Sequence, residues 1–232
     1  MGAQSGIGTP LLVSLLMIVG AAAAHGQQQT AERDPGRGGF VTAAGIVSAQ
    51  SEGQRDCPYL CGPLGGAGLG ATFAAGRRVT SRLSIGMEVT FAGVISGPQQ
   101  IRVSGGSLDV TAKHRDAVFS SIVSVSSSGT NEVVTGALVG TAGIVRRKTG
   151  RTGVRRSFSS PPAPFEEQLT DYVPAVGGGI DVLIHVRDRL SIAPLFRLHY
   201  FIDDDGGYPK QPPKRGVSSV LWLAGVGVQV RF

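Results

Sequence analysis

The last fifteen residues of the chain alternate between apolar and polar or small side chains. In residues 218–232 every even position after Ser218 is apolar, whereas the odd positions include glycine, Gln229 and Arg231. Strict alternation is typical of a β-strand whose two faces meet different surroundings. Because strands of soluble proteins average about 5–6 residues, a strand of this length favours a fold built from unusually long strands.

Seven further segments have the same character and bring the number of expected strands to eight. Three of them alternate clearly and four are less regular. In chain order the seven are residues 38–48, 64–76, 83–95, 115–125, 133–146, 172–186 and 190–202.

The connections between these segments alternate in length. Short connections lie at 77–82, 126–132 and 187–189. Long connections, which hold most of the prolines, lie at 49–63, 97–114, 147–171 and 203–216. This alternation predicts an up-and-down meander with one plain rim and one elaborated rim.

The composition excludes the competing classes. Glycine supplies 35 of the 232 residues, roughly twice its usual share of 7%, and it costs about 1 kcal/mol at each interior helix position. A helical bundle is therefore not expected. A chain with 41% hydrophobic and only 16% charged residues is also not expected to be disordered.

The two faces of the strands indicate a membrane as the surroundings. Large aliphatic residues occupy one face, and glycine, serine and threonine with some charged residues occupy the other. A soluble barrel would place the large apolar residues inside, whereas a barrel in a bilayer is apolar outside and polar within. We therefore expect an all-β domain over residues 38–232, an eight-stranded antiparallel up-and-down transmembrane β-barrel. Inward glycines would relieve crowding in its narrow interior.

The amino-terminal region predicts export. Residues 11–24 form an apolar run of 14, shorter than the roughly 20 residues of a transmembrane helix and suited to a secretory signal. We expect a signal peptide at 1–26 and a flexible leader at 27–37. In an oxidising compartment Cys57 and Cys61 predict a local disulfide. No further ligands cluster near them, so no metal site is expected.

The carboxyl end resembles a known family. The sequence VGVQVRF, which ends in Phe232, resembles the assembly signal of bacterial outer-membrane β-barrels, and residues 177–201 resemble the penultimate hairpin of small porin-like outer-membrane proteins. The resemblance is specific over 170–232. It implies an outer-membrane location, periplasmic termini, four surface loops and contact between the last strand and the barrel-assembly machinery. It implies no shared activity, and we expect a monomer without cofactor.

The polar face predicts a charged lumen. The strands at 83–95 and 190–202 lie on opposite walls of an eight-strand ring, so Glu88 is expected to reach Arg197. Unpaired buried charges cost several kcal/mol, which predicts a paired network that closes the lumen. Its expected members are Glu88, Asp181, His185, Arg197, His199 and Arg231. A small-solute channel is the alternative, and a soluble periplasmic barrel that binds an apolar ligand is a third.

Catalysis is not expected. His199 lies toward the outer rim with Asp203–Asp205 just beyond, but the chain has no GxSxG motif and no serine in a recognisable nucleophile setting. A lipid-modifying hydrolase is the enzymatic alternative.

A basic segment predicts an anionic partner. Six cations lie within eleven residues: Arg146, Arg147, Lys148, Arg151, Arg155 and Arg156. Nucleic acid is not expected, because the protein is exported and no aromatic residues interleave for stacking. In an outward loop these cations would meet lipopolysaccharide phosphates, and a merely solvated loop is the alternative.

Overall fold

The computed structural model describes residues 38–52, 66–97, 99–103, 106–127, 133–157, 161–202 and 219–232. The expected signal peptide, the leader, the cysteine pair Cys57 and Cys61, and Asp203–Asp205 lie outside these residues. No helix in the described ranges is long and apolar enough to cross a membrane.

Strands account for most of the described residues, and all eight predicted segments are among them. A ninth strand, β4, lies in a segment that was expected to be a connection. The strands are β1 (Gly39–Glu52), β2 (Gly66–Arg78), β3 (Leu83–Ser96), β4 (Gln99–Val103), β5 (Gly106–Ser126), β6 (Val134–Ser157), β7 (Ala163–Arg187), β8 (Leu190–Phe201) and β9 (Ser219–Arg231).

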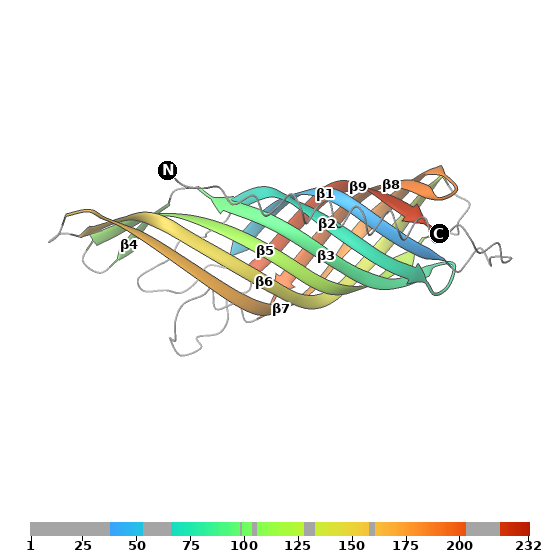
Figure 1. Cartoon of the computed structure of the whole chain (residues 1–232), viewed down its shortest axis with the longest axis horizontal. Helices are drawn as coiled ribbons and strands as arrows, with labels where there is room; N and C mark the ends of the chain where they lie inside the picture. Colours follow the sequence, from blue (N-terminus) through green and yellow to red (C-terminus); the bar gives the residue numbers. More distant parts are fainter. Residues whose placement is uncertain are drawn as a thin grey trace.

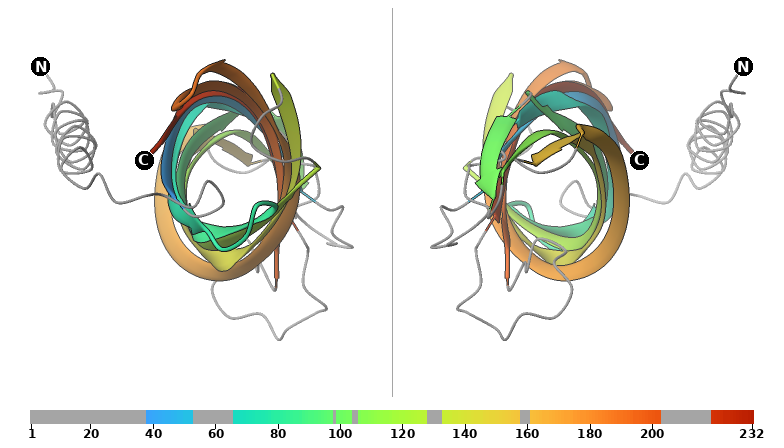
Figure 2. Two further views of the ribbon diagram at one scale, coloured as in Figure 1. Left: turned by 90° about the vertical axis from the view of Figure 1, so that its right-hand side faces the viewer. Right: turned by 90° about the vertical axis from the view of Figure 1, so that its left-hand side faces the viewer.

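Eight of these strands close into one antiparallel ring (Figures 1 and 2). Neighbours in the chain pair throughout, β3 pairs with β5, and β1 pairs with β9, so the ring has no open edge. β4 stands apart and pairs only with the start of β5. The predicted fold class, an eight-stranded up-and-down barrel, is confirmed.

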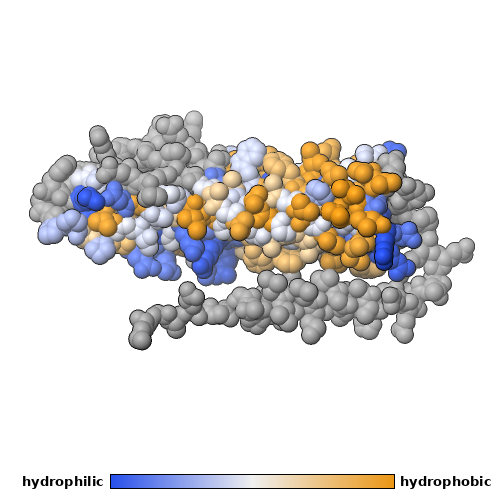
Figure 3. Space-filling view, turned by 90° about the horizontal axis from the view of Figure 1, so that it is seen from above, coloured by the Kyte–Doolittle hydropathy of each residue, from blue (hydrophilic) through white to orange (hydrophobic). Residues whose placement is uncertain are grey.

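Side-chain burial alternates along the strands and gives the ring a defined inside. On β3, Ser84 and Glu88 are buried whereas Ile85 and Met87 are exposed. On β9, Leu221 and Leu223 are buried whereas Trp222 and Val226 are exposed. Large apolar side chains thus cover the outside, where they gather over the half of the barrel that holds the C-terminus (Figure 3).

Close approach between strands explains part of the glycine content. A Cβ atom on Gly68 would lie 1.6 Å from the carbonyl oxygen of Gly93, and one on Gly143 would lie 1.9 Å from that of Phe119. Both glycines share the inward side of their strands with buried neighbours. Only glycine permits the backbone of an adjacent strand to come this near.

Three strands are longer than expected. β5, β6 and β7 contain 21, 24 and 25 residues, and they continue far beyond the point where β8 ends against Ala175. The prediction of connections at 97–114 and 147–171 was therefore wrong over most of both segments. Continuous pairing holds the extension together, from Gly106↔Ser157 on one side to Arg155↔Ala163 on the other.

The two ends of the barrel differ. Short connections join β2 to β3, β5 to β6 and β7 to β8 at the end where both termini of the described barrel lie. At this end the amide of Gly39 donates to the carbonyl oxygen of Phe232 (2.7 Å), and the amide of Phe232 donates to that of Gly39 (3.0 Å). Short turns mark the periplasmic end of outer-membrane barrels, and long connections mark the outer end.

Candidate functional site: the barrel interior and its outer rim

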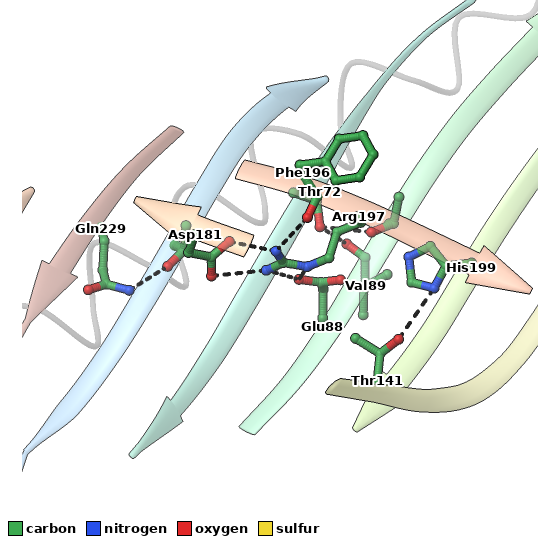
Figure 4. A network of polar contacts seen from close by, with 11 residues as sticks. Thr72, Glu88, Val89, Thr141, Asp181, Phe196, Arg197, His199 and Gln229 are labelled. Carbon is green, nitrogen blue, oxygen red and sulfur yellow. Dashed lines mark hydrogen bonds and ion pairs between the residues drawn. The ribbon is translucent and has the colours of Figure 1, made fainter. Parts of the chain in front are cut away.

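Arg197 on β8 lies at the centre of the interior. Its Nε and Nη2 atoms donate to Oε2 of Glu88 on β3, at 3.2 and 3.1 Å. Its Nη1 and Nη2 atoms donate to Oδ1 and Oδ2 of Asp181 on β7, at 2.5 and 3.0 Å. β3 and β8 stand four places apart in the ring, so this side chain bridges opposite walls (Figure 4).

Burial makes these contacts strong. Arg197 is 3% exposed and Glu88 is 2% exposed. A third acceptor, the carbonyl oxygen of Phe196, lies 3.2 Å from Nη1. Charge-assisted hydrogen bonds are roughly twice as strong as neutral ones, and removing one partner of a buried pair leaves an uncompensated charge.

Hydroxyl and amide groups surround this network. The Thr72 and Thr90 hydroxyls lie 2.8 Å apart, and Nε2 of Gln229 donates to Oγ1 of Thr42 at 3.2 Å. Between the network and the short-turn end lies a cavity of about 40 Å³, with Arg78 among its lining residues. A cavity of this size has room for about three water molecules.

The remaining predicted lumen residues form separate groups. Nδ1 of His199 lies 3.5 Å from the Thr141 hydroxyl. His185 lies nearer the short turns, where its Nδ1 atom accepts from Nη2 of Arg231 at 2.9 Å and lies 2.7 Å from the Ser191 hydroxyl. The six residues expected in one network thus divide into three groups, because their positions along the barrel axis differ.

An apolar layer lies on the outer side of the Arg197 network. Phe201, Leu221 and Leu223 are almost completely buried and pack in one cluster with inward valines and alanines of the other strands. Sequence reasoning missed this layer. The signal was present, since Leu221 and Leu223 share the parity of Gly225 and Gln229, but both faces of the strand are apolar there.

A second ion pair lies above the apolar layer. Nε of Arg147 on β6 donates to Oδ1 of Asp116 on β5 at 3.0 Å, and Nη2 donates to Oδ2 at 3.3 Å. The Arg147 guanidinium also lies 4.6 Å from the centre of the Phe201 ring. Nearby, His114 and Thr149 are in contact at 3.1 Å. Asp116 was not predicted, because the register of 115–125 was undefined.

The basic segment is therefore a strand with two faces and not a loop. Arg147 and Arg151 are buried on the inner face, and Arg151 lies 3.6 Å from Glu167. Arg146 and Lys148 are exposed on the outer face. Arg155 and Arg156 are exposed near the end of β6, where Arg156 pairs with Asp109 at 2.9 Å.

A closed ring of long strands with large apolar side chains outside and buried charges inside is the arrangement that a bilayer requires. The chain is an eight-stranded antiparallel up-and-down transmembrane β-barrel. A soluble carrier of an apolar ligand would have the opposite arrangement of faces, so that alternative is wrong.

No protein-family model and no curated protein matches this barrel. Three solved structures illustrate its likeness to known proteins. Neisserial surface protein A has 14% identity and a TM-score of 0.43, with 84% of this chain and 97% of that chain covered. A major outer-membrane protein from Thermus thermophilus has 16% identity and a TM-score of 0.45, with 82% and 99% covered.

The third structure is the outer-membrane protease OmpT from Escherichia coli. It has 7% identity and a TM-score of 0.41, with 88% of this barrel and 99% of that chain covered. Identities this low concern the fold alone, so no activity passes from these proteins to this barrel. What the barrel does must come from its own residues.

Proposed function

We propose that this protein is a closed outer-membrane barrel with a structural or surface-interaction role, and that it is neither a channel nor an enzyme. The observation that carries the proposal is the span of Arg197 across the lumen to Glu88, with Asp181 bound to the same guanidinium. A side chain that bridges opposite walls blocks the path along the axis.

Two barriers of different chemistry follow each other along that path. A polar solute would first have to displace the buried guanidinium from its carboxylates, which costs several kcal/mol. It would then meet the apolar layer of Phe201, Leu221 and Leu223. A cavity of about 40 Å³ below the network favours a small-solute channel, but it holds only a few waters.

The surface role is supported by the outer end of the barrel. β5, β6 and β7 continue as a paired sheet beyond the last residue of β8. Charged and polar side chains are exposed there, among them Glu166, Gln168 and Arg155. Contact of the last strand with the barrel-assembly machinery through Phe232, and a monomeric state, remain predictions.

Planar-bilayer conductance tests the closed barrel. Wild type is expected to show no channel openings. Arg197→Ala is also expected to show none, because the apolar layer remains, and Arg187→Ala at the exposed β7–β8 turn serves as the matched control. Discrete, reproducible openings in the wild type would overturn the proposal and favour the channel.

A further inference from the structure

Four cations gather on the outer wall of the barrel. Lys113 and Arg115 lie on β5, and Arg146 and Lys148 lie on β6; all four are exposed. Each alternates with a buried residue of the same strand, such as His114 or Arg147. They therefore point away from the lumen, and we call these four residues the outer basic patch.

The patch lacks compensating acid. Arg115 pairs directly with Lys148 in the strand register, and like charges in directly opposite positions are destabilising. Their neighbours on the flanking strands are uncharged: Gly93 and Ile95 on β3, and Thr170 and Tyr172 on β7. Within the described part of the chain, none of the four forms an ion pair. An external anion would relieve this repulsion.

The position of the patch along the barrel axis indicates which anion lies beside it. Exposed apolar residues such as Val125, Phe119 and Ile144 lie between the patch and the short turns. From Val125 to Arg115 the strand rises about 25 Å along the axis of a tilted barrel, which is about the height of the lipid-facing apolar band. The patch therefore lies where the hydrocarbon ends and headgroups begin, at the end away from the termini.

We propose that the outer basic patch binds the phosphate groups of lipopolysaccharide in the outer leaflet. The inference rests on the proposed placement of the barrel in the outer membrane. Arg115 and Arg146 supply planar donors suited to phosphate oxygens, and Lys113 and Lys148 supply compact charges. Tyr172, exposed next to Arg146 in the register, is the residue type that settles at a membrane interface.

This assignment differs from the one that the sequence suggested. The site now includes Lys113 and Arg115 of β5, although neither belongs to the arginine-rich segment. The site no longer includes Arg147 and Arg151, because their side chains are buried inside the barrel. The six cations of the predicted site are close in sequence, whereas strand pairing brings only two of them, Arg146 and Lys148, together with Lys113 and Arg115.

A binding experiment on the full mature chain in phosphatidylcholine nanodiscs tests the site. Binding of deep-rough lipopolysaccharide is compared for wild type, Arg115→Gln/Lys148→Gln and Arg77→Gln/Arg82→Gln. The last variant removes the same charge from exposed positions at the short-turn end. Each surface cation contributes about fivefold to binding of anionic lipid, so the first variant, which lacks two cations, is expected to bind about 25-fold more weakly, and the control is expected to match wild type.

Further arms separate the outcomes. Dephosphorylated lipopolysaccharide should bind wild type as weakly as intact lipid binds the patch variant, and Arg115→Lys/Lys148→Arg should retain binding. Equal losses in the patch variant and the control, or no loss in either, would overturn the proposal. Heat-modifiable gel migration of each sample reports barrel insertion separately, so a failed insertion counts against the membrane placement and not against the patch alone.

Discussion

Arg197 donates two hydrogen bonds to a single oxygen of Glu88, a residue 109 positions earlier in the chain and on the opposite wall of the barrel. The same guanidinium donates to both oxygens of Asp181. One cation thus holds two carboxylates inside the lumen, and the two sides of the network should respond very differently to substitution.

Arg197→Met is expected to lower the free energy of unfolding by about 3–5 kcal/mol, because it leaves the buried carboxylate of Glu88 and the partly buried carboxylate of Asp181 without their counter-charge. Glu88→Gln should cost less, since Asp181 still pairs with Arg197. Urea titration of the folded barrel in lipid vesicles measures both. Glu167→Gln is the control. The Glu167 side chain is 44% exposed where it contacts Arg151, so its loss should change stability by less than about 1 kcal/mol. Equal effects in all three variants would contradict the network.

Two ion pairs on the same pair of strands should differ in coupling. Asp116 and Arg147 face inward with side chains 0% and 2% exposed, whereas Asp109 and Arg156 face outward at 35% and 61%. A double-mutant cycle with Asp116→Asn and Arg147→Gln is expected to give a coupling above about 1 kcal/mol. The same cycle on Asp109 and Arg156 should give about 0.5 kcal/mol. A larger coupling at the exposed pair would refute this order.

Gly143→Ala is expected to destabilise the barrel by about 1–3 kcal/mol, because the new methyl group overlaps the Phe119 carbonyl on β5. Gly45→Ala provides the control, since nothing lies within 4 Å of its added Cβ, and it should change stability by no more than about 0.5 kcal/mol. The fraction of heat-modifiable, folded barrel after refolding in detergent is the measurement. If both variants refold equally well, close strand approach is not why glycine occurs at 143.

Phe201→Ala should remove about 3–5 kcal/mol of stability, because it opens a cavity in the apolar layer and removes the ring beneath Arg147. Phe196→Ala on the same strand is the matched control, since its ring faces outward beside Trp222 and lipid can replace it. Chemical unfolding in vesicles compares the two. A loss at Phe196 as large as the loss at Phe201 would show that the layer is not a core.

The strands that lie in the bilayer, and the faces on which their side chains lie, could be predicted from the sequence. There, one face meets lipid and the other meets the lumen, so the residues of β3, β8 and β9 alternate and Glu88 and Arg197 fall on the same side. Beyond the bilayer the outer face meets water in place of lipid, and the buried inner face includes polar side chains such as Thr149 and Arg151, so hydrophobic alternation disappears. The outer halves of β6 and β7 therefore looked like connections.

Whether each basic residue of β6 faces inward or outward could not be predicted, because the strand register of this segment was not evident from the sequence. Arg147 and Lys148 are neighbours in the chain, yet one is buried beside Asp116 and the other is exposed on the outer wall. Composition cannot separate them, because both belong to the same run of cations. Only strand pairing, which brings Arg115 opposite Lys148, divides the run into an interior pair and an exterior patch.

The seam between β1 and β9 also bears on biogenesis. Phe40 pairs with Arg231, so the ring is sealed by segments from opposite ends of the described barrel. Until β9 pairs with β1, both strands present a row of unpaired amides and carbonyls to their surroundings. A barrel that has not yet closed can therefore pair through these edges with a neighbouring copy, so its topology requires that the two edges be protected until β1 and β9 meet.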